Sequence, residues 1–279
     1  MKINAGMGEK NDFDILSKQE IVGRLSSQWA GREVVFFEET GSTNVEAKML
    51  ADHGAVHGTL VVADSQREGK GRRGRIWHSQ SGSAIAMSLI LKPQLEPEKA
   101  SMLTLIQAVA TAKALEEVGG VKPQIKWPND ILINEKKVCG ILTEMYLDKT
   151  EISSIIIGSG INVNQNAFPE EIAQIATSLK RETGQKLSRA KLIGRICEIF
   201  EEYFEKFMEL KDLSGMLEEY NDYLISKGRM VHVLDPKGEF TGEALGINVC
   251  GELLVRKVTG EITNVYAGEV SVRGIYGYV

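Results

Sequence analysis

Residues 125–147 read IKWPNDILINEKKVCGILTEMYL, and this stretch decides the fold. Two apolar runs, Ile125–Ile133 and Val138–Leu147, flank a short polar turn, a pattern that is typical of a β-hairpin. Pro128 has no N–H to donate, so it interrupts the first run at a place that only a sheet edge or a bulge tolerates. A further apolar run, Ile152–Val163, adds another strand. The sequence therefore predicts a mixed or antiparallel sheet.

Helices and more strands are predicted on both sides of this hairpin. Apolar residues at 3.6-residue spacing indicate helices, and short runs of small and β-branched residues indicate strands. Thr43 and Glu46 have the spacing of a capping box at the start of one helix, Gly54 follows its end, and Ser17 is a candidate N-cap for another. The predicted helices are Ile15–Leu25, Val45–His53, Ser101–Val118 and Ser188–Leu210, and the predicted strands are Val34–Phe37, Thr59–Ala63 and Ala84–Leu91.

The pattern of apolar and turn residues changes after Gly228. Short strand-like runs separated by turns such as Asp235-Pro-Lys-Gly238 follow one another without a helical pattern, which suggests a small barrel that packs on the main domain. We therefore expect an N-terminal extension with a short helix, a main domain and a C-terminal barrel, with bounds 1–33, 34–227 and 228–279. The predicted strands of the barrel are Met230–Leu234, Thr241–Val249, Glu252–Val258 and Glu261–Val270.

Composition excludes several classes of protein. The 279 residues are 43% hydrophobic, and 33 Lys and Arg against 38 Asp and Glu give a net charge of −5, so no overall field attracts nucleic acid or anionic lipid. The sequence shows neither a secretory signal nor an apolar run long enough to span a membrane. The three cysteines lack C-x-x-C spacing and lie in apolar segments, which favours a reducing cytoplasm, and the four histidines lack metal-ligand spacing.

The loop 66–75 reads QREGKGRRGR and holds five cations and one anion, a local charge of +4 in an acidic chain. Glycines alternate with the cations, so backbone N–H groups and guanidinium forks can converge on one anion, as in phosphate-cradling loops. The pattern is not that of a P-loop. A solvated basic loop or a nucleic-acid patch remains an equal alternative, although no surrounding basic or aromatic stripe supports nucleic acid.

Four shorter motifs are each weak alone. Lys126–Asp130 combines a cation, an amide and a carboxylate, but a hairpin with an irregular entry explains it as well. Glycines within Lys137–Leu142 and Gly158–Val163 permit close approach of a ligand or simply mark bulges. Ser42-Thr-Asn44 offers donors and acceptors at a helix N-terminus, or only caps that helix.

Six motifs taken in order resemble those of biotin protein ligases, from about Val34 to the C-terminus. The resemblance implies an α+β fold: a mixed β-sheet with flanking helices, as in class II aminoacyl-tRNA synthetases, followed by an SH3-like barrel. A lipoate-type ligase of related fold and a nucleic-acid-binding module that uses the basic loop remain alternatives. The motifs are Gly41–Asn44, Gln66–Trp77, Lys126–Asp130, Lys137–Glu144, Gly158–Val163 and Gly268–Arg273.

The resemblance also implies a two-step reaction. Biotin and ATP, with Mg²⁺, give biotinyl-5′-AMP and pyrophosphate, and a lysine of a biotin carboxyl carrier protein then takes the biotinyl group. About 30 residues precede the first strand, too few for a winged helix-turn-helix, so we expect a monofunctional cytoplasmic ligase without DNA binding. The family also allows a homodimer.

Site residues follow by position in the matched motifs. Lys126, Arg72 and Asp130 are the catalytic candidates, with Asp130 orienting or deprotonating the incoming lysine. Lys70 stands where the family often has arginine, so the loop keeps its charge but lacks a bidentate fork there. The biotin-binding candidates are Ser42, Thr43, Asn44, Gln66, Gly69, Lys70, Gly71, Arg72, Trp77, Lys137 and Gly140, and the ATP-binding candidates are Arg72, Arg75, Lys126, Asn129, Asn162 and Arg273; no metal ligand is predicted.

Overall fold

The main sheet of the protein has seven strands in the order β1-β2-β3-β7-β6-β5-β4. The computed structural model describes residues 14–235, 238–267 and 271–274. β1 and β2 are parallel and every other neighbouring pair is antiparallel, so the predicted mixed sheet and α+β class are confirmed. The strands are β1 Val34–Thr40, β2 Leu60–Gln66, β3 Ala84–Leu91, β4 Gln124–Lys126, β5 Asp130–Ile133, β6 Lys136–Asp148 and β7 Glu151–Asn162.

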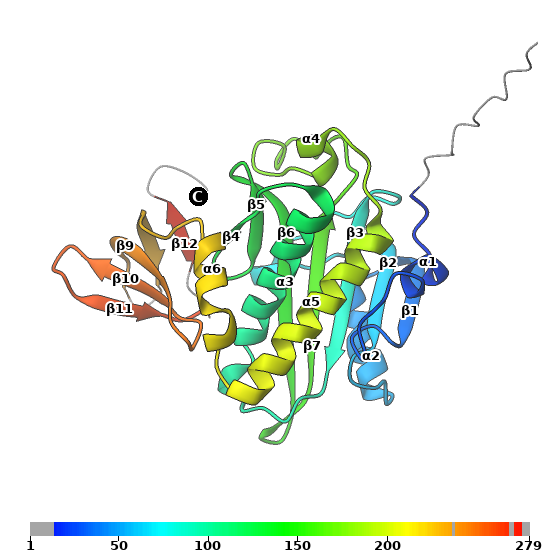
Figure 1. Ribbon diagram of the computed structural model, residues 1–279, viewed down its shortest axis with the longest axis horizontal. Helices are drawn as coiled ribbons and strands as arrows, with labels where there is room; N and C mark the ends of the chain where they lie inside the picture. Colours follow the sequence, from blue (N-terminus) through cyan, green and yellow to red (C-terminus); the bar gives the residue numbers. More distant parts are fainter. Residues whose placement is uncertain (1–13, 236–237, 268–270, 275–279) are drawn as a thin grey trace, which may run out of the picture.

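Helices cover the two faces of this sheet unequally. Alternate residues of β3, such as Ile85 and Leu89, pack into the core under α3 (Met102–Gly119) and α5 (Arg189–Leu210), which lie side by side in Figure 1. On the opposite face, α2 (Thr43–Asp52) packs through Ala47 and Ala51 on a small cluster of sheet residues, Val61, Ile90 and Ile156. Because side chains alternate between faces, the polar Ser88 of β3 lies on the face of α2. Only α2 among these three helices packs on that face.

The predicted strand Ile125–Ile133 is wrong as a single element. β4 and β5 pair with each other, with Lys126 opposite Asp130, so the chain reverses through residues 127–129. Pro128 follows a cis peptide bond at this reversal. Its ring has no N–H for a strand ladder, which is why the first apolar run breaks there. The reversal brings the cation and the carboxylate of this motif side by side.

The predicted capping box at the start of α2 is also wrong. Ser42 is the N-cap and makes no side-chain cap bond, so Thr43 is the first helical residue and Glu46 the fourth. A capping box needs its hydroxyl at the N-cap and its carboxylate at the third helical position, so the motif is one residue out of frame. Glu46 instead accepts a hydrogen bond from Thr40 at 2.6 Å. Gly54, with φ +93°, follows the C-cap as predicted.

The short helices of the chain were the hardest to predict. The helix predicted over Ile15–Leu25 is α1, Lys18–Val22, and Ser17 caps it as predicted by accepting from the backbone N–H of Glu20. α4 (Leu179–Thr183) and α6 (Leu217–Tyr223) were not predicted. Both have fewer than eight residues, too short for a clear period of 3.6.

The C-terminal part is a small antiparallel sheet in the order β11-β10-β9-β8-β12, so a C-terminal β domain is confirmed. It lies beyond the β4 edge of the main sheet (Figure 1). Residues 1–13, 236–237, 268–270 and 275–279, which include parts of the predicted extension, of the predicted turn 235–238 and of the last predicted strand, lie outside the described residues. The strands of the C-terminal sheet are β8 Met230–Leu234, β9 Phe240–Ile247, β10 Leu253–Lys257, β11 Ile262–Val265 and β12 Ser271–Gly274.

Two hydrogen bonds join this C-terminal sheet to the motifs of the main domain. The indole Nε1 of Trp127 donates to the carbonyl of Gly251 at 3.1 Å. The guanidinium Nη2 of Arg72 donates to the carbonyl of Ala267 at 3.0 Å. The expected packing of the C-terminal unit on the main domain is therefore confirmed, and it occurs at the residues that the motifs single out.

The cysteines depart from expectation in one case. Cys139 and Cys197 are buried, but Cys250 is exposed. It lies in a turn whose backbone is held by Asn248, since Asn248 Oδ1 accepts from the Cys250 N–H at 3.0 Å. Within the part of the chain that the structure describes, no helix is long and apolar enough to cross a membrane.

Candidate active site

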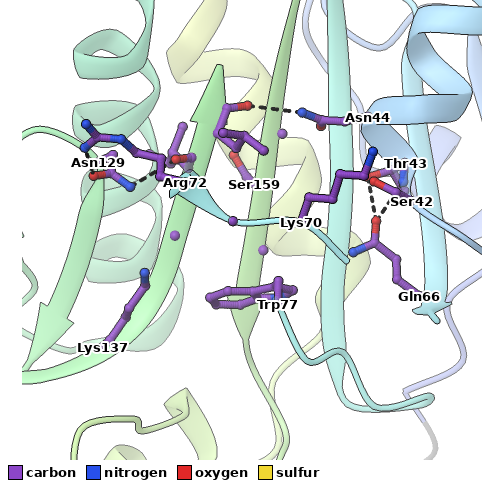
Figure 2. Close-up of a pocket in the computed structure, with 16 residues that line it drawn as sticks. Ser42, Thr43, Asn44, Gln66, Lys70, Arg72, Trp77, Asn129, Lys137 and Ser159 are labelled. Atoms are coloured by element: carbon purple, nitrogen blue, oxygen red, sulfur yellow. Dashed lines mark hydrogen bonds between the residues drawn. The ribbon is translucent and has the colours of Figure 1, made fainter. Parts of the chain in front are cut away.

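A cavity opens on the sheet face that carries α2, under the loop that joins β2 to β3 (Figure 2). It is lined by residues of five of the six sequence motifs, which the fold brings together. Five lining residues were not among the predicted site residues: Ile141, Leu142, Gly158, Ser159 and Gly160. The predicted residues that line it are Ser42, Thr43, Asn44, Gln66, Lys70, Gly71, Arg72, Trp77, Asn129, Lys137 and Gly140.

Glycines form the floor of this cavity. Gly160 of β7 pairs with Gly140 of β6, and a Cβ added to Gly160 would lie 2.3 Å from the indole of Trp77. One added to Gly158 would lie 2.1 Å from Oδ1 of Asn44. The register of β6 and β7 shifts only beyond Tyr146, so these glycines permit close approach and do not mark bulges.

The indole of Trp77 lies across this floor. Its ring is 3.2 Å from a Cβ built on Gly140, and Nζ of Lys137 stands 5.6 Å above the ring centroid. The buried Nε1 has no hydrogen-bond partner among the described residues. The flat indole of Trp77, packed against glycine backbone that carries no side chains, forms one wall of a slot that can hold a flat ligand.

A polar wall closes one end of the cavity. Oε1 of Gln66 lies 2.7 Å from the backbone N and 3.0 Å from Oγ1 of Thr43 (Figure 2). These contacts fix the amide of Gln66 with its oxygen toward Thr43, so its Nε2 is left to donate elsewhere. A Cβ on Gly69 would lie 2.9 Å from this nitrogen, so Gly69 supports the wall without being a cavity-lining residue.

The glycine-arginine loop folds over the cavity as a small hairpin. The N–H of Gly71 donates to the carbonyl of Arg75 at 2.7 Å, and that of Trp77 to Gly69 at 2.8 Å. Arg72 donates through Nη1 to Asn129 Oδ1 at 2.7 Å and through Nη2 to the carbonyl of Ala267. Burial lowers the pKa of Arg72 from its usual value, but a guanidinium stays protonated at neutral pH. One cation therefore ties the loop to the Lys126–Asp130 motif and to the C-terminal sheet.

A cluster of charges borders the cavity. Nζ of Lys137 lies 2.7 Å from Oδ1 of Asp130. Burial is the main cause that lowers the pKa of Lys126 to about 8; the charge of Asp130 opposes this shift, and the nearby cations Lys137, Arg273 and Arg75 add to it. The predicted residues Arg75 and Arg273 thus lie within electrostatic reach of Lys126, although none of the three lines the cavity. A surplus of cations suits a polyanion.

Asn162 has a different environment. Its Nδ2 donates to the carbonyl of Thr177 at 3.0 Å, and its Oδ1 accepts from Gln165 at 3.1 Å. These bonds hold the segment that follows β7, and Asn162 does not line the cavity. Its role at a nucleotide stays a prediction.

Comparisons with known proteins agree with this arrangement. Residues 37–162 match the model of the biotin/lipoate A/B protein ligase family, and residues 228–273 match that of the biotin protein ligase C-terminal domain. The bifunctional ligase/repressor BirA of Bacillus subtilis is 41% identical over 257 residues, which cover 91% of this chain and 78% of that protein. The biotin–[acetyl-CoA-carboxylase] ligase of Paracoccus denitrificans is 30% identical, over 79% of this chain and 93% of that one.

A solved structure gives the same result. The biotin protein ligase from Aquifex aeolicus in complex with biotin and ATP superposes with a TM-score of 0.75 at 32% identity, covering 87% of this chain and 99% of that chain. Both family matches fall on the two sheets described above, and the first spans all the residues that line the cavity. This chain therefore belongs to the biotin protein ligases.

Proposed function

We propose that the protein is an ATP-dependent ligase that activates biotin as biotinyl-5′-AMP and transfers it to a lysine of a biotin carboxyl carrier protein of a carboxylase. The observation that carries the proposal is the slot of glycine and indole, closed by a polar wall and bordered by cations. Such a site suits a flat polar ring whose acyl tail ends at a nucleotide phosphate. A monofunctional role without DNA binding, a cytoplasmic location and a homodimer stay predictions.

The ring of biotin would occupy the slot over the glycine floor. Its ureido group can accept from Nε2 of Gln66 and contact Thr43 and Asn44 at the polar wall. The carboxylate would then face Lys137 and the backbone of the loop at Gly71. Lys70 also lines the cavity, so it keeps a positive charge at the place where the family often has arginine.

Adenylation needs charge neutralisation and positioning more than covalent help. An oxygen of the biotin carboxylate attacks the α-phosphorus of ATP, the bond to the bridging oxygen breaks, and pyrophosphate leaves. Lys126, Arg75 and Arg273 supply positive charge for the phosphates. Arg72 and Asn129, which bond each other at 2.7 Å, close the loop over the acyl phosphate and exclude water.

Transfer needs a neutral amine on the acceptor. The lysine nitrogen attacks the carbonyl carbon of biotinyl-5′-AMP, AMP leaves and the amine loses a proton. A lysine with an ordinary pKa of about 10.4 is mostly protonated at pH 7, so a group that orients it and takes the proton accelerates the step. Asp130 is our candidate, held by Lys137 at 2.7 Å and by Asn129 at 3.0 Å.

Mg²⁺ is proposed to enter with the nucleotide. Among the described residues, no group of three or more His, Cys, Asp or Glu side chains could hold a metal ion. Mg²⁺ usually keeps several waters and binds one or two carboxylates together with substrate phosphates. The residues present therefore fit a metal that is held chiefly by ATP, where it would neutralise phosphate charge.

The test is biotin-dependent exchange of labelled pyrophosphate into ATP by the purified protein with Mg²⁺. Lipoate in place of biotin and a reaction without acid are the parallel controls. Exchange with biotin alone supports the proposal, whereas exchange with lipoate alone moves the substrate to lipoate. Exchange with neither, together with salt-dependent binding of DNA or RNA that is lost when Arg72, Arg73 and Arg75 are neutralised, would favour a nucleic-acid-binding module.

Adding one methyl group to the cavity floor is expected to damage biotin binding. In Gly160→Ala the new Cβ would lie 2.3 Å from the indole of Trp77, so the ring must leave its place. We expect the Kd for biotin to rise by at least about tenfold, as when about 1.4 kcal/mol of binding free energy is lost. Isothermal titration calorimetry measures the effect, and Gly119→Ala is the control, since its Cβ meets nothing closer than 3.5 Å. An unchanged Kd for Gly160→Ala would contradict this account of the floor.

The pH dependence of adenylation should report the charge of Lys126. Its lowered pKa of about 8 means that the cation is present below pH 8 and is lost as the pH rises above it. We therefore expect kcat/KM for ATP in the exchange assay to fall above pH 8, since this parameter follows the protonation of the free enzyme. Lys126→Arg keeps its charge and should lose this alkaline limb. If the wild type and Lys126→Arg show the same fall in kcat/KM above pH 8, a group other than Lys126 causes that fall.

A further inference from the structure

Asn44 is held in one orientation by residues on two strands. Its side chain is buried, with 5% of the residue exposed. Nδ2 donates to Oε2 of Glu144 at 2.7 Å and to the carbonyl of Leu142 at 3.3 Å, so both amide hydrogens point to β6. Oδ1 lies on the other side, 2.6 Å from Oγ of Ser88 on β3. A carboxylate can only accept hydrogen bonds, so Glu144 excludes the opposite orientation of the Asn44 amide, in which Oδ1 would face the carboxylate.

The fixed amide sets the direction of the hydrogen bonds that follow. Oδ1 of Asn44 can only accept, so the single proton of the Ser88 hydroxyl must go to it. Oγ of Ser88 also lies 2.8 Å from Oγ1 of Thr43, and with its own proton used it can only accept there. The Thr43 hydroxyl has a second acceptor within reach, Oε1 of Gln66 at 3.0 Å, but that oxygen already accepts the backbone N–H of Thr43 at 2.7 Å. The nearer Ser88 oxygen, at 2.8 Å, therefore takes the Thr43 hydroxyl proton. These contacts form a hydrogen-bond chain in which Thr43 donates to Ser88, Ser88 donates to Asn44, and Asn44 donates to Glu144.

The direction of this chain decides what the cavity offers a ligand. With its proton turned to Ser88, Oγ1 of Thr43 presents lone pairs, and the neighbouring Nε2 of Gln66 presents hydrogens. An acceptor beside a donor matches a cyclic urea, which gives an N–H to Thr43 and takes a hydrogen bond on its carbonyl. A dithiolane ring has neither group.

The strand register keeps this chain in place. Ser88 pairs with Gly158 of β7, which pairs on its other side with Leu142 of β6, so the three form one row across the sheet. Asn44 lies over the glycine of that row, since a Cβ at Gly158 would be 2.1 Å from its Oδ1. Ser88 is fully buried, so its hydroxyl depends on protein partners.

We propose that Glu144 and Ser88 are positioning residues that fix the polarity of this hydrogen-bond chain and so make the site selective for a ring that donates an N–H. The inference rests on the proposed function, because the ring in question is the ureido ring of biotin. Neither side chain lines the cavity, so both act through Asn44 and Thr43.

The test compares biotin with its two isosteric cyclic carbamates, in each of which one ring N–H is replaced by oxygen. Calorimetry gives the Kd of each ligand for the wild-type protein and for Ser88→Ala, Glu144→Leu and Glu144→Gln. The wild type should prefer biotin over the carbamate whose oxygen faces Thr43 by at least about tenfold, the effect of one correctly directed buried hydrogen bond. In Ser88→Ala and Glu144→Leu the Thr43 hydroxyl loses Ser88 as its fixed acceptor and can turn its proton toward the ligand, so this preference should fall several-fold.

Two variants should keep the preference. Glu144→Gln still offers an amide oxygen to Nδ2 of Asn44, and the carbonyl of Leu142, which can only accept, still holds the second amide hydrogen, so Asn44 keeps its orientation. Glu151→Leu removes an exposed carboxylate elsewhere on the sheet. Equal weakening of biotin and carbamate in Ser88→Ala and Glu144→Leu, or an unchanged preference, would overturn the inference, because a merely structural role would weaken both ligands alike. Failure of the wild-type protein to bind biotin at all would instead overturn the proposed function.

Discussion

Lys126→Ala is expected to lower the rate of biotinyl-5′-AMP formation by about 10²–10³-fold, as when one preorganised charge is removed from a site where negative charge develops. Lys126 faces Arg75 and Arg273 within one cluster, and its burial lowers its pKa to about 8. A cation whose charge is already costly without a ligand gains most when a phosphate arrives. The measurement is biotin-dependent pyrophosphate exchange.

Two controls separate charge at the site from general damage. Lys122→Ala removes the same charge from an exposed position four residues earlier and should leave exchange unchanged. Transfer from preformed biotinyl-5′-AMP to an acceptor should be reduced much less than adenylation, because pyrophosphate has already left. Exchange at the wild-type rate in Lys126→Ala would contradict the role of Lys126 in the first step.

Arg72→Ala should release biotinyl-5′-AMP about 10- to 100-fold faster, the factor that corresponds to losing one or two hydrogen bonds to a charged group. Arg72 joins the loop to Asn129 at 2.7 Å and to the carbonyl of Ala267 at 3.0 Å. Without these bonds the loop lacks its contact with both other segments, so water and the intermediate can exchange. Release is measured by forming the labelled intermediate and chasing it with unlabelled biotin and ATP.

The neighbouring arginine provides the matched control. Arg73 is exposed and takes a φ of +59° in the same turn, but among the described residues its side chain makes no hydrogen bond to another segment. Arg73→Ala removes the same charge as Arg72→Ala, but it should retain biotinyl-5′-AMP as the wild type does. Equal release from Arg72→Ala and the wild type would show that the loop does not depend on this arginine.

Regular patterns in the sequence predicted most of the fold. The long helices α3 and α5 and the hairpin of β5 and β6 follow from periods of 3.6 and 2 over many residues. Pro128 marked an interruption of this apolar run, but the chain reversal at Trp127–Asn129 could not be predicted, because Ile125 and Ile131 continue the same apolar pattern on both sides of it. The capping box failed because the N-cap depends on the backbone of Ser42, and one residue of shift moves every cap position.

The sequence predicted the motifs that form the site, but the way in which they come together depends on the topology of the sheets. The residues of the 42–44, 66–77 and 137–140 segments meet around one cavity, as the motif resemblance implied. Arg273 reaches Lys126 only because β12 pairs with β8, a contact that no local pattern contains. Ser88 was missed, although a single polar residue inside the apolar strand Ala84–Leu91 was a signal in the sequence. The glycines Gly158 and Gly160 were noted as permissive, but their purpose needed the indole and the amide that lie on them.

The position of Trp77 gives the protein its own optical probe. The chain has three tryptophans, and the indole N–H groups of Trp29 and Trp127 bond Glu205 and the carbonyl of Gly251. Trp77 alone of the three lines the cavity, and its buried N–H has no partner among the described residues. A ligand that enters the slot changes the polarity around this one ring, so intrinsic fluorescence reports occupancy against a steady background from the other two.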